Sequence, residues 1–201
     1  MGLTIVQAGD PVLRQLARPL QAGEITGSEI QDLIRRMQKA MYDAPGVGLA
    51  APQVGIPVQL AVIEDRADYH KEISPAQLAE RERRPVPFQV IVNPTITSTP
   101  AIGNAVEFYE GCLSLAGFTA LVPRQRTLRV ECLDERGKPK VIEASGWYAR
   151  ILQHEIDHLH GVLYIDRMRS RTFGSVENWK RFWKDKPIEE IRSELNAQAS
   201  L

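Results

Sequence analysis

The feature that most constrains this chain is the run His154-Glu155-Ile156-Asp157-His158, which lies in a stretch with helical periodicity. A spacing of four residues places His154 and His158 on one helix face, one turn apart, so that two ring nitrogens can bind one ion. Glu155 projects about 100° around the helix from His154. Its carboxylate can therefore lie beside the ion and accept a proton from water without being a ligand. The less specific alternative is a solvated helix whose histidines bind nothing.

The helix that carries this run is predicted to begin after Ser145 and to end before Gly161. Serine is a common N-cap residue, and glycine is common just beyond a helix C-terminus. Apolar side chains recur at helical spacing along one face: Tyr148, Ile151, Leu152, Ile156 and Leu159. We therefore expect a central helix with strands packed around it.

Two further helices are expected outside this segment. Residues 26–44 have helical periodicity, and Thr26 with Glu29 fits a capping box at the start. A final helix is expected within 175–196. Between these regions, GVGLAAPQVG at 46–55 has neither helical nor strand periodicity, and we interpret it as a loop of small residues.

The remaining segments predict strands. We expect strands at 58–63 and 88–97, and a hairpin in which residues 128–132 are followed by a turn and by 141–142. The charged, proline-containing stretch 64–87 is interpreted as a surface insertion, because neither side is long enough to be a separate domain.

Length and composition fit one ordinary domain. The chain has 201 residues, of which 43% are hydrophobic, so it can bury a substantial core. Basic and acidic residues are balanced at 25 each, which excludes a strong overall attraction to nucleic acid or an acidic membrane. No apolar run approaches the roughly 20 residues that span a bilayer, and the first residues do not resemble a secretory signal. We expect a cytoplasmic α+β protein of one domain (1–201), with 171–201 as a C-terminal extension.

Two histidines alone do not form a catalytic metal site, because such an ion needs a third protein ligand and an open position. Metzincin proteases supply a third His six residues after the second, but this chain has Tyr164 there. A downstream glutamate, as in thermolysin-like enzymes, could come from Glu177, Glu189 or Glu190. None of these stands in a recognisable motif.

Cys112 is a better candidate for the third ligand. It lies in the run EGCLS at 110–114, where Gly111 leaves space beside the thiol. A thiolate binds Zn²⁺ or Fe²⁺ well, and coordination removes its proton. The other cysteine, Cys132, lies on an alternating strand and is expected to be a buried apolar residue. Too few cysteines are present for a disulfide scaffold.

Three separated motifs make the sequence similar to a known family. GVGLAAPQ at 46–53, EGCLS at 110–114 and QHEIDHLHG at 153–161 resemble the three motifs of the peptide deformylases, in the same order. The resemblance covers roughly residues 5–170.

The resemblance implies roles for the residues of these motifs. Cys112, His154 and His158 match the family's metal ligands, and Glu155 matches its catalytic acid/base. Gln53 and the backbone N–H of Leu113 match the donors that stabilise the developing oxyanion. The resemblance also implies that Gly48, Gly46 and Ile151 bind substrate, with Ile151 lining a pocket for methionine.

The same resemblance implies cofactor, substrate and partners. One divalent ion is expected per chain, Fe²⁺ in most family members, with Zn²⁺, Ni²⁺ or Co²⁺ able to replace it. The expected reaction removes the N-formyl group from the initiator methionine of new polypeptides near the ribosome exit and releases formate. We expect no direct contact with nucleic acid or membrane, a monomer or homodimer, and a bacterial rather than organellar cytoplasmic enzyme.

Some positions depart from the family or remain open. Several deformylases carry an Arg seven residues after the metal-binding Cys, where this chain has Thr119. Asp157 could orient a ligand histidine or be solvated on the helix surface, while His160 is expected to be an ordinary polar position and His70 to be exposed. The alternatives to the deformylase are a zinc endopeptidase with a downstream ligand and a metal-binding member without activity.

Overall fold

The computed structural model describes residues 2–98 and 103–199. Its strands form an antiparallel five-stranded sheet in the order β1-β2-β3-β6-β7 and a three-stranded sheet in the order β4-β5-β8. The bounds are β1 (Gly48–Ala50), β2 (Leu60–Asp65), β3 (Val86–Ile96), β4 (Ala105–Cys112), β5 (Leu115–Gln125), β6 (Thr127–Leu133), β7 (Pro139–Ser145) and β8 (Gly174–Ser175). The α+β class expected from the sequence is confirmed.

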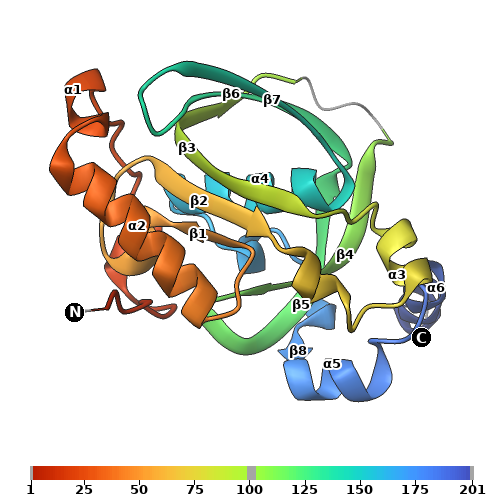
Figure 1. Cartoon of the computed structure of the whole chain (residues 1–201). Helices are drawn as coiled ribbons and strands as arrows, with labels where there is room; N and C mark the ends of the chain where they lie inside the picture. The colour runs from red at the N-terminus through yellow and green to blue at the C-terminus, as the bar shows by residue number, and fades with distance from the viewer. Residues whose placement is uncertain (1, 99–102, 200–201) are drawn as a thin grey trace.

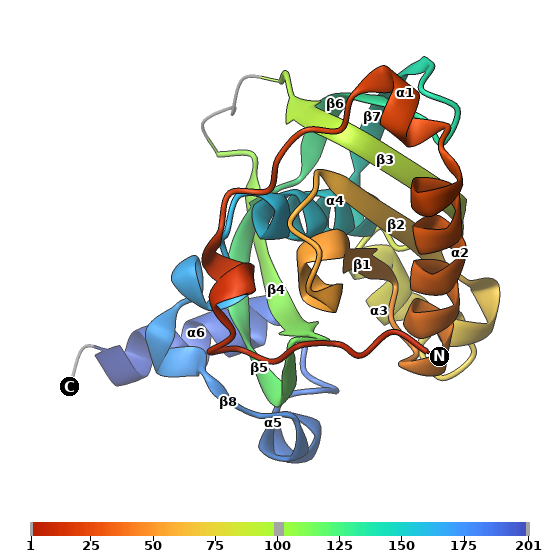
Figure 2. The ribbon, with the colours of Figure 1, turned by 90° about the vertical axis from the view of Figure 1, so that its left-hand side faces the viewer.

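Helix α4 (Gly146–Leu159) occupies the centre of the molecule. Figures 1 and 2 show it enclosed between the five-stranded sheet and the long strands β4 and β5. Ser145 is its N-cap residue as expected, although the Ser145 side chain makes no capping hydrogen bond. Gly161 lies just beyond the helix with φ +71°, a left-handed conformation that glycine adopts without steric cost.

Strand β2 of the five-stranded sheet is buried on both faces. Ala61 and Ile63 of β2 belong to the apolar cluster that contains α4, whereas Leu60 and Val62 belong to the cluster on the opposite face. This alternation follows from the period of two along a strand. Helix α2 (Ser28–Asp43) covers that second face, as Figure 1 shows. Its buried side chains are Leu33, Ile34, Met37, Ala40 and Met41.

Two local predictions near the N-terminus need correction. Helix α2 begins at Ser28 with Gly27 as N-cap, rather than at Thr26 with a capping box. Thr26 instead ends the preceding short helix α1 (Ala22–Ile25), so its backbone is already committed to that turn. The stretch 46–55 is not a loop throughout, because it forms β1 and the 3₁₀ helix η2 (Ala51–Val54). Long-range pairing of β1 with β2 creates a strand that has no periodicity of its own.

The predicted final helix is two helices, α5 (Val176–Phe182) and α6 (Ile188–Ala199). Pro187 precedes α6; proline lacks the N–H that a helix interior needs and disfavours helical backbone in the residue before it. The two helices therefore form separately on either side of that point.

Residues 64–87 carry a 3₁₀ helix, η3 (Ala67–His70), and a short helix, α3 (Pro75–Glu80), over a largely exposed segment. The expectation that His70 is exposed is wrong. Its side chain is 11% exposed, and Nε2 lies 3.2 Å from Oδ1 of the fully buried Asp65. The remaining short elements are η1 (Pro11–Arg14), η4 (Tyr164–Asp166) and η5 (Ser170–Thr172). Within the described ranges, no helix combines the length and apolarity needed to cross a membrane.

Candidate metal and active site

Cys112, His154 and His158 converge between the small sheet and α4. Sγ of Cys112 lies 3.2 Å from Nε2 of His158, and one potential ligand atom from each of the three residues lies within 4.8 Å of the others. Cys112 ends β4, where the pairing with β5 shifts register after Glu110. A register shift of this kind bends a strand and re-aims its side chains.

The chemistry of this donor set fits a catalytic metal site. One thiol and two imidazoles are ligands that bind Zn²⁺ or Fe²⁺, and three protein ligands leave a coordination position for water or substrate. Among the residues that the structure describes, the downstream glutamates Glu177, Glu189 and Glu190 do not join the two histidines in such a group. The arrangement therefore matches the expectation that Cys112 accompanies the histidines.

Glu110 orients one of the two histidines. Its Oε2 lies 3.1 Å from Nδ1 of His154, which leaves Nε2 of that ring free for an ion. Arg124 binds both carboxylate oxygens of Glu110 at 3.0 Å, and Arg150 binds Oε1 at 2.6 Å. Burial alone would raise the pKa of Glu110, but Arg124 and His154 hold it well below its usual range. Burial lowers the pKa of His158 well below its usual value, which favours the neutral, ligating ring.

Asp157 performs neither role considered for it. It is buried, and its carboxylate binds Arg124 and Arg167 rather than a histidine or solvent. Arg124 therefore joins Asp157 of α4 to Glu110 of β4. The sequence offered no signal for this network, because the spacing of its members along the chain depends on the pairing of β4 with β5 and on the packing of α4.

Glu155 lies in a pocket that only a glycine neighbour permits. Its side chain is almost fully buried, and Oε2 has no hydrogen-bond partner within the described part of the chain. A β carbon at Gly48 would lie 2.6 Å from Cδ of Glu155, closer than real contacts allow. Burial raises the pKa of Glu155 to about 7, and a nearby cation would lower it. The carboxyl group is thus suited to exchanging protons near neutral pH.

Gln53 directs its amide toward the thiol of Cys112. The backbone N–H of Ala50 donates to Oε1 of Gln53 at 2.8 Å, which fixes the side chain. Nε2 of Gln53 then lies 3.4 Å from Sγ of Cys112 and 3.3 Å from Oγ of Ser114. Gln53 is therefore a rigid hydrogen-bond donor at the edge of the candidate metal site.

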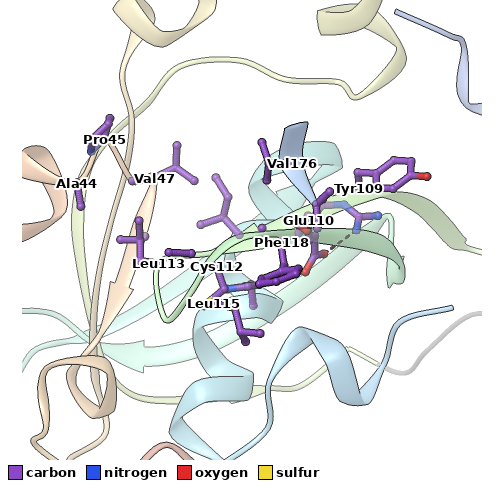
Figure 3. A pocket seen from close by; sticks show the side chains of 18 of the residues that line it. Ala44, Pro45, Val47, Tyr109, Glu110, Cys112, Leu113, Leu115, Phe118 and Val176 are labelled. Carbon is purple, nitrogen blue, oxygen red and sulfur yellow. Dashed lines mark hydrogen bonds and ion pairs between the residues drawn. The ribbon is translucent and has the colours of Figure 1, made fainter. Parts of the chain in front are cut away.

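A cleft with a volume of about 920 Å³ opens onto these residues. Gly46, Gly48, Leu113 and Ile151, all expected near substrate or the reacting group, line it. In Figure 3 the cleft runs from Ala44 and Pro45, past Cys112 and Leu113, to Val176 and Tyr109. Its wall is predominantly apolar, as in pockets that hold small ligands.

Thr119 lines the cleft and also holds the small sheet together. Its buried hydroxyl donates to the backbone carbonyl of Glu110 at 2.7 Å, and its backbone pairs with Gly174 of β8. The sequence did not predict that the C-terminal segment helps to form the cleft, which Val176 and Trp179 of α5 also line. The sequence indicated Tyr164 only as a position that lacks a ligand, whereas the buried Tyr164 ring stacks beside His154 at a centroid distance of 6.3 Å.

Comparison with known proteins finds one consistent family. The family model described as polypeptide deformylase matches residues 3–173. The chain is 47% identical to the chloroplastic peptide deformylase 1A of Solanum lycopersicum, over 87% of this chain and 62% of that protein. It is 43% identical to peptide deformylase 3 of Streptomyces avermitilis, over 96% of this chain and 83% of that protein. The chain thus spans less than two thirds of the tomato protein.

A solved structure shows the same fold. The peptide deformylase of Synechococcus elongatus, crystallised with actinonin, is 40% identical and superposes with a TM-score of 0.69, covering 84% of this chain and 82% of that one. The similar proteins therefore include bacterial and chloroplastic enzymes.

Proposed function

The chain belongs to the polypeptide deformylase family, and we propose on this premise that it hydrolyses N-formylmethionyl peptides and releases formate. The observation that carries the proposal is the convergence of Cys112 with His154 and His158, beside a buried Glu155. A purely structural metal site would need no such carboxylate.

Cys112, His154 and His158 would hold one divalent ion, for which we propose Fe²⁺, with Zn²⁺, Ni²⁺ or Co²⁺ as substitutes. When bound, the ion would supply Lewis-acid polarisation and make a nucleophilic water available at neutral pH. Glu110 would keep His154 in the tautomer that presents Nε2, through the contact at Nδ1.

Glu155 would move the proton. Water attacks the formyl carbon while Glu155 accepts one of its protons, and the C–N bond then breaks as Glu155 passes that proton to the departing amine. The products are formate and the free amino terminus. Burial raises the pKa of Glu155 and a bound ion would lower it, so these two effects on the carboxyl group oppose each other.

Gln53 and Leu113 would stabilise the charge that develops on the formyl oxygen. The Nε2 amide of Gln53 already faces Cys112, and Leu113 follows that residue directly. Loss of one such donor costs about 10²–10³ in rate in comparable enzymes. Gly46 and Gly48 would let the substrate backbone approach, and Ile151 would contact the side chain of methionine.

The reaction can be tested by formate release from formyl-Met-Ala-Ser with protein loaded anaerobically with Fe²⁺, Ni²⁺ or Zn²⁺. We expect turnover by the wild type and none by Glu155→Gln, with the ion still bound in the variant. Cys112→Ala should lose the ion; full metal content in that variant would point to a different third ligand. Inactivity of all three metal forms would refute the proposed function.

We also propose that the enzyme acts on nascent chains near the ribosome exit in a bacterial cytoplasm. Formylated methionine occurs at the start of new polypeptides, which supports the first point. The second is supported by the bacterial relative from Streptomyces avermitilis, which is 43% identical over 96% of this chain. Cell fractionation of the source organism with an antibody would test it.

A further inference from the structure

Arg81 lies in the wall of the cleft, on the segment between α3 and β3. Its guanidinium carbon is 5.6 Å from the ring centroid of Trp147 and 5.9 Å from that of Phe108. The residue lines the cleft together with Trp147, the second residue of α4. It is half-buried. No role in the reaction described above requires a cation at this position.

The neighbouring charged groups are already committed to other partners. Arg83 makes two hydrogen bonds of 2.8 Å to Asp65, and Arg150 is bound to Glu110. The charge of Glu80, adjacent in sequence, raises the pKa of Arg81 in part, but its carboxylate accepts a hydrogen bond from the backbone N–H of Ile188 at 2.8 Å and makes none with the Arg81 side chain. Within the described residues, the Arg81 side chain has neither an ion pair nor a hydrogen-bond acceptor.

An unpaired, partly desolvated guanidinium is unfavourable unless an anion can reach it. Burial and the charge of Arg83 lower the pKa of Arg81, because both make the charged form of the guanidinium less favourable. The aromatic faces of Trp147 and Phe108 compensate only in part, because a cation–π contact lacks the directional acceptors of a carboxylate. A carboxylate entering the cleft would supply them.

The backbone of Arg81 is held against the start of α4. A β carbon at Gly146 would lie 2.8 Å from the carbonyl oxygen of Arg81, so the two segments are in direct contact. The backbone of Arg81 is therefore a fixed part of the cleft wall, and its guanidinium rests against the rings of Trp147 and Phe108. Preorganisation of this kind lowers the entropic cost of binding a ligand.

The distance from the candidate metal site selects the part of the substrate that would reach Arg81. Trp147 precedes His154 by seven residues, so both lie on one face of α4 and are separated by about 10 Å along its axis. An extended peptide advances about 3.3 Å per residue. A peptide whose formyl group lies at the metal site would therefore bring its second or third residue to the level of Trp147. Lys180 of α5, which is exposed, lines the same cleft and adds positive charge.

We propose that Arg81 forms an anion subsite that binds the carboxylate of an acidic side chain at the second or third position of the substrate peptide. The inference rests on the proposed deformylase activity and extends it to a preference among substrates. It makes Arg81 a specificity-determining residue that takes no part in the chemical step.

The test compares formyl peptides that differ only in charge. C-terminally amidated formyl-Met-Glu-Ala-Ser and formyl-Met-Ala-Glu-Ser are each paired with the peptide that carries Gln in place of Glu. We expect kcat/KM of the wild type to be about fivefold to tenfold higher for at least one Glu peptide than for its Gln partner, as for the difference between a charge-assisted and a neutral hydrogen bond. Arg81→Gln should remove that preference while leaving the Gln peptides unchanged, and Arg81→Lys should retain part of it.

Arg84→Gln is the matched control, because Arg84 is an exposed arginine of the same segment that does not line the cleft; it should behave like the wild type. Equal kcat/KM for Glu and Gln peptides in the wild type would overturn the inference. An equal loss for both in Arg81→Gln would do the same, because it would show a structural role. A preference seen only for peptides with a free C-terminal carboxylate would refute the side-chain assignment. No formate from any peptide would instead refute the deformylase activity itself.

Discussion

At Gly48 the backbone of β1 runs so close to Glu155 that a β carbon would lie 2.6 Å from Cδ and 2.9 Å from Cγ of that side chain. Glu155 is packed on α4 and has little room to retreat, since its exposed fraction is 3%. The position of the Glu155 carboxylate therefore depends on the absence of a side chain at Gly48 of β1. This is a steric requirement for glycine that involves no unusual φ angle.

Gly48→Ala should displace Glu155 and lower kcat by about 100-fold, the loss expected when a catalytic group moves by about 1 Å. The ion should stay bound, because Glu155 is not among the proposed ligands. Formate release and metal quantitation measure the two quantities separately. Gly23→Ala is the control, since a β carbon there meets nothing within 4 Å. Full activity of Gly48→Ala would show that Glu155 can move without consequence.

Glu110 is a second residue on which the stability of the fold depends, because it is the counterion of two buried arginines. Glu110→Gln should lower the free energy of unfolding by about 3–5 kcal/mol, since Arg150 would keep a buried charge without a carboxylate and Arg124 would keep only Asp157. Metal affinity should fall about 10–100-fold as His154 loses its orienting carboxylate. Denaturant unfolding and a metal-binding titration measure these effects.

Glu143→Gln provides the comparison, because Glu143 pairs with Arg129 at the surface and is 69% exposed. Its loss should change the free energy of unfolding by less than about 1 kcal/mol. Similar losses from the two variants would contradict the importance assigned to burial of the Glu110 network.

At the scale of whole elements, the packing of α4 against the segment that follows α3 depends on Gly146. Gly146 has φ +57°, and a β carbon would lie 2.8 Å from the carbonyl oxygen of Arg81. Gly146→Ala should lower the free energy of unfolding by about 3 kcal/mol, combining backbone strain with a clash against backbone.

Gly55→Ala separates the two contributions. Gly55 also has a left-handed φ, +81°, but a β carbon there meets nothing within 4 Å. It should therefore lose about 1 kcal/mol from strain alone. Equal losses in chemical denaturation would mean that the start of α4 and Arg81 are not in the contact described.

The elements that sequence could predict are those whose signal is local. Helix α4 and the β6–β7 hairpin were predicted because apolar periodicity and turn residues lie within the segments themselves. β1 was missed because only its pairing with β2 makes it a strand. The metal ligands were predicted from motif spacing and family resemblance. Arg81 was not, because its proximity to Trp147 results from the path of residues 64–87 around the start of α4.

The candidate metal site connects the two sheets when the molecule is considered as a whole. Cys112 belongs to the three-stranded sheet, whereas α4 packs on the five-stranded sheet through the cluster that contains Leu152 and Ile156. The ion pairs of Arg124 with Glu110 and Asp157 make the same connection electrostatically. A bound ion would thus add a further link between β4 and α4.

Removing the ion should therefore lower the stability of the whole domain. A ligand that binds only the folded state stabilises it by about 2.7 kcal/mol at a free concentration 100 times Kd. For a chain of 201 residues this corresponds to a rise in Tm of about 5–10 °C on loading. Differential scanning calorimetry of the chelated and reloaded protein measures the shift. Cys112→Ser should show a much smaller rise, because its hydroxyl is a poorer ligand for the proposed ions. Cys132→Ser changes the other cysteine, which is buried outside the site, and should keep the full rise. An equal rise in both variants would mean that the ion does not connect β4 to α4 through Cys112.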